Sequence, residues 1–520
     1  MSILSQLTNR FLNLSAPLQL LIWLIAILVI KFDTLIAPPV WDTAMGVFPP
    51  AIFLYENNFN ILELVQLPGW WQGGPNVHSL SLWTWLIAIV MTITQNAQAT
   101  FFIIHSITFL LCAYAISTLV RTLVLMDIKP YLAILAGLTL LLTPMVLVQI
   151  GYMYTEAPVM ALSVLAWASW YHHREGQAVA LAVIAISIKA TGLIIGLCLM
   201  PLLIFRLIDS FTKKRLILLI SIPIFYYAHS ALFGWLGGKN NVPDMPWGNS
   251  EVVMNGLFSR VNYAIDLKSL VGAGIIASIL YILYHWYQSK KIIPLHQFYQ
   301  TCLKDGTPFI AICYLFVFIL GIFYSTFQGD LFLYRYIAPM IPFTIITLTL
   351  IALSLRIQGI MATIAFFACC VSIYNHNGAL YNPSGAFSMV ESSHAYKDYL
   401  LAQKTIIDQI QELNDETPIY VSREIDYMTS SPMMGYLDPL KPNVFGFYKD
   451  EYSGMYIEDF PPEYYVALTN GSHGGVRLSW AIRKAREAAD KGWLVEPIAG
   501  QIIGGIPMTI HRMYNPALLN

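Results

Sequence analysis

Charged side chains are scarce in this sequence. They make up only 11% of the 520 residues, whereas 57% of the residues are hydrophobic. Soluble domains carry about 25% charged residues, so the shortage excludes an ordinary soluble protein over most of the chain. Apolar runs of about 15 to 22 residues recur from position 17 to about 375, and a helix needs about 20 apolar residues to cross a hydrocarbon core. We therefore expect a polytopic α-helical membrane protein.

Lys and Arg are missing altogether between Phe32 and Val120. Lys and Arg accumulate in short cytoplasmic loops, so this gap indicates an extracytoplasmic loop, which we place at residues 38–99. Its apolar stretch "HSLSLWTWLIAIVMTIT" is short, and we interpret it as a juxtamembrane or re-entrant helix. We place the later basic groups inside: Arg121 with Lys129, Arg174, Arg206 with "KKR" at 213–215, "KK" at 290–291, and Arg356.

Cysteines are few, and the six present lie in apolar runs or in one loop that we place inside. A disulfide framework is therefore not expected. The first apolar run, "APLQLLIWLIAILVIKFDTLIA", is not followed by a small-residue cleavage pattern, which favours a retained signal anchor. The net charge of −1 gives little indication of partners, and we expect membrane lipid but no nucleic acid among them.

About eleven spans connect these groups, with the N-terminus cytoplasmic and the C-terminus extracytoplasmic. The transmembrane domain covers residues 1–380. The predicted spans are 15–37, 100–121, 131–151, 157–173, 177–189, 190–208, 216–235, 269–287, 307–325, 336–354 and 357–375.

The chain from residue 385 to 520 has the pattern of an extracytoplasmic α/β domain. "TPIYVS", "EYYVALT", "GWLVEPI" and "MTIHRMY" are typical of strands. "AYKDYLLAQKTIIDQIQEL" and "RLSWAIRKAREAAD" have helical spacing with charged faces. The domain contains neither a Gly-rich phosphate loop nor a nucleophile elbow.

Four ionisable residues meet at the outer membrane face in this arrangement. Asp42 follows the first span, Glu156 opens an inward span, Lys189 lies at an outer turn and Arg335 precedes the tenth span. Two carboxylates and two cations at one depth indicate a site for an anionic substrate with acid/base chemistry. Each also has a structural alternative, because acidic residues cap helices and basic residues anchor spans at headgroups.

The order of these segments resembles the GT-C superfamily of polyprenyl-phosphate-dependent glycosyltransferases, especially its protein O-mannosyltransferase and aminoarabinose-transferase branch. The matching stretches, in order, are "WDTAMGVFPPAIFLYENNF", "GGPNVHSLSLWTWL", "TEAPVMALSVLAWASW", "IKATGL" and "YRYIAPMIP". The first loop has one Asp where many members have an acidic pair, and Ala190 replaces the usual proline after Lys189. The resemblance covers about residues 15–350.

This resemblance implies an integral membrane enzyme that moves a hexose or pentose from a lipid-phosphate donor to a glycan, lipid or protein acceptor. Asp42 is the expected general base and Glu156 orients the acceptor, while Arg335 and Lys189 bind the donor phosphate. The expected stereochemical outcome is inversion, by analogy with inverting hydrolases. The lining residues would be Trp41, Trp70, Trp71, His78 and Tyr334, although aromatic residues at this depth commonly anchor a span instead.

No metal is obligatory for this reaction, because fixed cations can stabilise the departing phosphate, but the sequence leaves a divalent metal open. A bacterial inner membrane is the expected location, and the sequence leaves the endoplasmic reticulum open as an alternative. Two alternatives remain at this point: a transporter or flippase for a lipid-linked glycan, and a ligase that joins lipid-diphosphate-linked glycans. The polar candidates lie at span ends rather than at the bilayer midplane, which favours the transferase.

Overall fold

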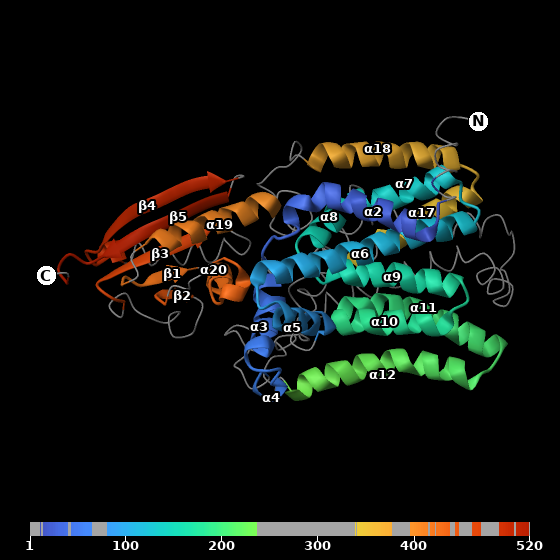
Figure 1. The fold of residues 1–520 in the computed structure, drawn as a ribbon, viewed down its shortest axis with the longest axis horizontal. Coiled ribbons are helices and arrows are strands. Elements are labelled where there is room, and N and C mark those ends of the chain that lie inside the picture. The colour runs from blue at the N-terminus through green and yellow to red at the C-terminus, as the bar shows by residue number, and fades with distance from the viewer. Residues whose placement is uncertain are drawn as a thin grey trace, which may run out of the picture. The chain divides into compact units, whose positions relative to one another are not determined.

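A computed structural model shows the fold (Figure 1). It describes residues 11, 14–39, 43–64, 81–236, 338–339, 341–376, 396–413, 416–421, 423–436, 442–446, 460–469, 488–503 and 506–518. Packing groups the chain into two compact units, each described by itself below. The first comprises Met1–Phe32, Ile107–Ile150 and Thr155–Tyr374, and the second comprises Asp33–Ser106, Gly151–Tyr154 and Asn375–Asn520. The boundary expected near residue 380 separates a membrane part from an extracytoplasmic part. Because the structure contains no membrane, this boundary stays a prediction.

Helices occupy the described apolar runs within a few residues of the expected bounds. The predicted run 131–151 is divided between two helices, α7 and α8. The helices are α2 (Ala16–Lys31), α6 (Ala97–Leu125), α7 (Pro130–Leu142), α8 (Pro144–Gly151), α9 (Glu156–Tyr171), α10 (Glu175–Ile188), α11 (Leu193–Asp209), α12 (Lys213–Leu236), α17 (Ile341–Ser354) and α18 (Gln358–His376).

Two of the described helices, α2 with its 3-10 extension and α6, are long and apolar enough to cross a membrane by themselves. A third span is reached if α7 and the helix after it, bent by 62° between them, count as one. The expected spans at 269–287 and 307–325 lie outside the described residues, so the total of eleven stays a prediction.

Two helices carry exposed apolar stripes of the kind that faces lipid. On α2 the stripe includes Leu18, Leu21, Ile25 and Val29, the last of them 77% exposed. On α18 it runs through Ile360, Ile364, Phe367 and Val371. Residues spaced three and four apart share one helix face, and water would not favour such a surface. The stripes indicate that these helices face hydrocarbon.

Helix α9 is surrounded by protein instead. Fourteen of its residues are buried, from Glu156 to Ser169, and a helix that is buried on all sides lies in the interior of its unit. It contacts α10, α11 and α17, and α9 to α12 form neighbouring layers in Figure 1.

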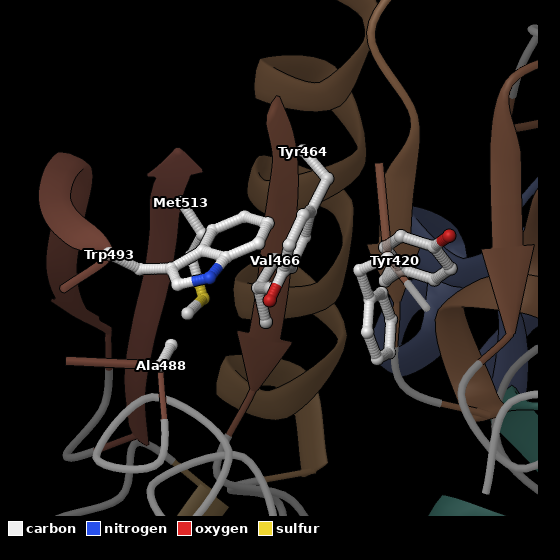
Figure 2. Close-up of a cluster of buried hydrophobic side chains, with 7 residues drawn as sticks. Tyr420, Tyr464, Val466, Ala488, Trp493 and Met513 are labelled. Atoms are coloured by element: carbon white, nitrogen blue, oxygen red, sulfur yellow. The ribbon is translucent and has the colours of Figure 1, made fainter. Parts of the chain in front are cut away.

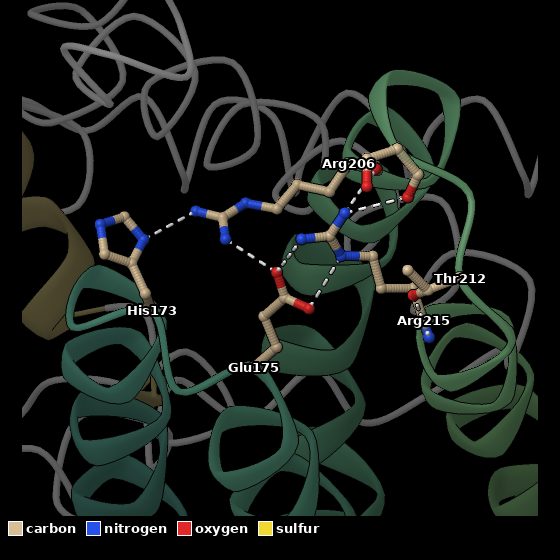
Figure 3. Close-up of polar contacts among 6 residues, drawn as sticks. His173, Glu175, Arg206, Thr212 and Arg215 are labelled. Carbon is tan, nitrogen blue, oxygen red and sulfur yellow. Dashed lines mark hydrogen bonds and ion pairs between the residues drawn. The ribbon is translucent and has the colours of Figure 1, made fainter.

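A cluster of charged side chains joins the ends of α10, α11 and α12 (Figure 3). Glu175 accepts hydrogen bonds from Arg206 Nη1 at 2.7 Å and from Arg215 Nε and Nη2 at 3.1 Å each. Arg206 also contacts His173 Nδ1 at 3.0 Å and lies over the Trp170 ring. Arginine forks suit such multiple contacts. The cluster brings together Arg206 and Arg215, which the sequence places on one side of the membrane.

The C-terminal part of the second unit contains a five-stranded mixed sheet in the order β2-β1-β3-β5-β4. Strand β1 (Ile419–Val421) pairs in parallel with β2 (Val444–Gly446) and β3 (Glu463–Thr469). Strand β5 (Ile506–Tyr514) runs antiparallel to β3 and to β4 (Leu494–Ile503). Helix α19 (Tyr396–Glu412) packs along β3, β4 and β5 (Figure 1). The α/β character expected from the sequence is therefore confirmed.

A buried aromatic cluster joins this sheet to the segment at residues 488–493 (Figure 2). The Tyr464 ring lies between Tyr420, at 5.4 Å, and Trp493, at 5.6 Å. The other buried members of the cluster are Phe460, Val466, Ala488 and Met513. Edge-to-face and tilted ring pairs of this kind add to the free energy of apolar burial. Of the predicted helix "RLSWAIRKAREAAD", only Ala488–Asp490 lies within the described residues, and it is helical.

Candidate functional site

Glu156 and Lys189, two of the residues expected at the site, form an ion pair. Lys189 Nζ donates to Glu156 Oε1 at 2.5 Å. The Glu156 side chain is fully buried, and that of Lys189 is 11% exposed. A carboxylate with no exposure to water requires compensation, because burial of an unpaired charge costs several kcal/mol. The pair therefore holds two functional groups from separate helices in one fixed place.

The start of α9 positions the carboxylate. Glu156 is the first residue of the helix, where the dipole favours negative charge. Thr155 Oγ1 donates to Glu156 Oε2 at 3.2 Å, so each carboxylate oxygen has a partner. The Cys112 thiol of α6 reaches the carbonyl of Ala157 at 3.9 Å. Glu156 therefore has the helix N-terminal position that was considered from the sequence, and it also forms the ion pair with Lys189.

The end of α10 positions the ammonium. Lys189 follows the last helical residue in an extended conformation, with φ −158° and ψ 146°, and its backbone N–H still donates to the Ala185 carbonyl. The 3-10 turn Ala190–Gly192 then leads into α11. The Gly192 N–H closes this turn on the Lys189 carbonyl at 2.8 Å.

Gly192→Ala is expected to destabilise the turn. A Cβ at Gly192 would lie 2.3 Å from the Ala185 carbonyl carbon, which is backbone and cannot move aside easily. Overpacking of this kind costs about 1–3 kcal/mol. Gly176→Ala, in the preceding helix α10, is the matched control because a Cβ there meets nothing within 4 Å. Thermal unfolding in detergent should show a lower midpoint for Gly192→Ala only; equal midpoints for the two variants would contradict this account of the turn.

The segment that follows Asp42 belongs to the second unit. Residues Thr43–Val47 form a π-helical turn, η2, and α3 (Phe48–Glu56) follows directly. Thr43 is buried, and its hydroxyl donates to the Tyr152 carbonyl at 3.3 Å. Its backbone is thereby tied to the segment Gly151–Tyr154, which precedes Glu156 in the sequence.

The other expected site residues lie outside the described residues. They are Trp41, Asp42, Trp70, Trp71, His78, Tyr334 and Arg335. Their roles therefore stay predictions. Among the residues that the structure describes, no group of three His, Cys, Asp or Glu side chains could hold a metal ion. The predicted juxtamembrane stretch contains helix α5 (Leu82–Thr94), capped by the Ser81 hydroxyl.

Pairing with Glu156 changes what Lys189 can contribute. The two opposite charges cancel at a distance, so the pair presents less positive potential to a phosphate than a lone lysine would. An ammonium has three donors, of which Glu156 Oε1 accepts one. The sequence predicted that both residues lie at one membrane face but not that they bind each other.

Sequence reasoning also missed Tyr436, whose hydroxyl donates to the Pro39 carbonyl at 2.9 Å. Pro39 lies three residues before Asp42. The only local signal was the turn-forming "SSPMMGY" stretch, which marks a turn but does not indicate what the turn contacts.

No protein-family model matches this sequence, and no curated protein matches it. Solved structures do match it in fold. ArnT from Cupriavidus metallidurans in the apo state matches with a TM-score of 0.50 and 13% sequence identity, over 95% of this chain and 98% of that chain. The structure of ArnT bound to undecaprenyl phosphate gives a TM-score of 0.46 at 13% identity, over 94% and 97%.

The chain thus shares with ArnT a fold of apolar helices followed by a C-terminal mixed sheet. At 13% identity, this likeness concerns the fold. The resemblance that the ordered sequence motifs indicated is confirmed at the level of the fold.

Proposed function

We propose that the protein is an integral membrane glycosyltransferase that moves a sugar from a polyprenyl-phosphate donor to an acceptor on the extracytoplasmic face. The observation that carries this proposal is the fold shared with apo ArnT along 95% of the chain. ArnT has also been solved with undecaprenyl phosphate bound, and that ligand is the kind of lipid phosphate that the proposed reaction releases. The buried Glu156–Lys189 pair adds a fixed polar site among apolar helices.

The choice of donor follows from the side of the membrane on which the enzyme is proposed to act. Nucleotide sugars are made in the cytoplasm, so an enzyme acting outside requires a sugar that has been carried across the membrane. A lipid-linked sugar phosphate meets that need, because its chain lies among the spans while its phosphate stays at the headgroups. The proposed location is a bacterial inner membrane, with the N-terminus cytoplasmic and the C-terminal sheet outside.

The proposed chemistry is a single displacement at the anomeric carbon. Asp42 accepts the proton of the acceptor hydroxyl or amine as the new glycosidic bond forms. The bond from the anomeric carbon to the phosphate oxygen breaks, and its electrons remain on the polyprenyl phosphate. Attack from the face opposite the phosphate inverts the configuration. Arg335 stabilises the charge that grows on the phosphate, with Lys189 beside it, so no metal is obligatory.

Glu156 orients the acceptor, directly or through Lys189. The proposed sugar pocket comprises Trp41, Trp70, Trp71, His78 and Tyr334. The acceptor is a glycan, a lipid or a protein, and the sugar is a hexose or pentose.

Release of the lipid phosphate tests the function. The purified protein in lipid vesicles would receive a polyprenyl-phosphate sugar and candidate acceptors, and free polyprenyl phosphate would be measured. A transferase releases it in proportion to the glycosylated acceptor. Movement of the donor across the vesicle without release would establish the flippase alternative, whereas activity only with a lipid-diphosphate glycan would establish the ligase.

Arg335→Ala is expected to reduce kcat/KM for transfer by about 100-fold or more. A guanidinium contact that strengthens as charge develops on the phosphate stabilises the transition state more than the bound donor, so kcat falls as well as affinity. Arg356→Ala is the control, because Arg356 is predicted to lie on the cytoplasmic side. Steady-state kinetics with the same donor would measure kcat and KM for both variants. Unchanged kcat in Arg335→Ala would remove this residue from the site.

A further inference from the structure

A segment of the C-terminal domain packs on the first outer loop within the second unit. Helix α20 (Arg423–Met428) contacts the turn η2 at Thr43–Val47. The short 3-10 helix Pro432–Met434 and its flanking residues follow. We call residues 423–436 the loop support. Two hydrogen bonds tie it to the loop that contains Asp42, and a third contact reaches that loop through Phe101 of α6.

The first contact is a hydrogen bond close to Asp42 in the sequence. Tyr436 Oη donates to the Pro39 carbonyl at 2.9 Å. Burial raises the pKa of this hydroxyl well above its usual value, and the neighbouring Tyr152 adds to the shift, although the residue as a whole is half-buried. The hydroxyl therefore stays protonated and keeps its donor throughout the physiological pH range.

The second contact fixes the helix that follows. Gly435 has a φ of +74°, and a Cβ there would lie 2.6 Å from the Phe101 ring. Phe101 in turn packs against Phe48, the first residue of α3, with ring centroids 5.8 Å apart. Glycine suits Gly435 on both grounds, because it adopts positive φ without strain and admits the close approach of the ring.

The third contact lies at the far end of α3. Ser431 Oγ donates to Glu56 Oε1 at 3.4 Å while accepting the Met433 N–H that caps the 3-10 helix. Thr43, held by the Tyr152 carbonyl, lies between the first two contacts along the chain. The loop is thus contacted at the Pro39 carbonyl, at the Thr43 hydroxyl and at the Phe48 ring, on both sides of Asp42 in the sequence.

We propose that Tyr436 is a positioning residue for the transfer reaction: through Pro39, the C-terminal domain holds the outer loop in the geometry that the base at Asp42 requires. This inference rests on the proposed function. A base works only if its carboxylate stays in line with the acceptor proton, and a displacement of about 1 Å can reduce the rate by about 100-fold. A single carbonyl anchor near the base is therefore enough to affect kcat.

The test removes one hydroxyl. Tyr436→Phe keeps the ring but loses the donor to Pro39. Tyr514→Phe is the matched control: it makes the same change on β5 of the same domain, where the hydroxyl has no hydrogen bond to the described residues. Both variants are made in the full-length protein in nanodiscs, with kinetics and amide hydrogen exchange measured for each.

Tyr436→Phe should lower kcat by about 10- to 100-fold with KM for the lipid-phosphate sugar unchanged within about twofold. Exchange in residues 43–48 should rise about tenfold, because local opening becomes easier, while β3 and β5 keep their protection. Tyr514→Phe should match wild type in both. Kinetics and loop exchange of Tyr436→Phe equal to those of the control would overturn the proposal.

The two measurements separate this inference from the proposed function. If wild-type protein releases no lipid phosphate, the function fails, and the exchange comparison alone still decides whether Tyr436 holds the loop. If wild type is active and Tyr436→Phe loosens the loop without lowering kcat, the positioning role in the reaction is refuted.

Discussion

Asp42→Asn is expected to reduce sugar transfer by about 10²- to 10⁴-fold, which is the usual contribution of a general base. Asparagine has nearly the same shape as aspartate but cannot take the proton from the attacking acceptor. Donor binding should persist, because Asp42 is not assigned to the phosphate. The measurement is single-turnover transfer from a polyprenyl-phosphate sugar, together with titration of the donor in the absence of acceptor.

Asp33→Asn provides the matched control for this variant. Asp33 allows the same Asp-to-Asn change, is exposed, and lies nine residues earlier, near the end of the first predicted span. It should keep wild-type activity. If Asp42→Asn retains most of its activity, or if both variants lose activity equally, the assignment of Asp42 as the base is wrong.

Lys189→Met is expected to destabilise the folded protein by about 3–5 kcal/mol, because it leaves the fully buried Glu156 carboxylate without its cation. Glu156→Gln alone should cost less, since Lys189 is 11% exposed and reaches water more easily. In the double variant both charges are gone, so most of the stability should return. Denaturant unfolding of the purified proteins measures the free energy of unfolding for the two single variants and the double variant.

Across the same two single variants and the double variant, sugar-transfer activity should not follow stability. If the pair also serves the reaction, the double variant folds but transfers sugar at least about 100-fold more slowly, because a positioned group is missing. The half-buried pair between Arg512 and Glu463, whose side chains are 34% and 24% exposed, provides a control with better access to water. Glu463→Gln should cost at most about 1 kcal/mol and leave activity unchanged.

Two outcomes would contradict this account of the pair. A stable Lys189→Met variant would show that the Glu156 charge is compensated elsewhere. A double variant with wild-type transfer would show that the pair is structural only and would remove both residues from the site.

Local patterns in the sequence were enough to predict most of the elements. The apolar run at 157–173 became α9 at Glu156–Tyr171, and "EYYVALT" became β3. Both signals depend on residues near one another, because helix and strand periodicities repeat within a few positions. The division of the run 131–151 at Thr143 and Pro144 was not predicted, although a proline removes a backbone donor and favours a break.

The contacts of the site were harder to predict. The bond between Lys189 and Glu156 joins residues 33 positions apart, and the bond from Tyr436 to Pro39 spans 397 positions. Span counting placed the first two residues at one membrane face, since the length of each helix limits where its ends can lie. No such constraint links a turn in the C-terminal domain to a particular loop carbonyl, so the role of Tyr436 required the structure.

The most direct test of the central claim is an experimental structure of the protein in nanodiscs with undecaprenyl phosphate bound. The account predicts the phosphate within charge-assisted hydrogen-bond distance, about 2.7–2.9 Å, of Arg335, with Lys189 near it and Asp42 facing it across the sugar position. A phosphate bound away from these residues, or Asp42 on the opposite side of the membrane from Glu156 and Lys189, would contradict the account.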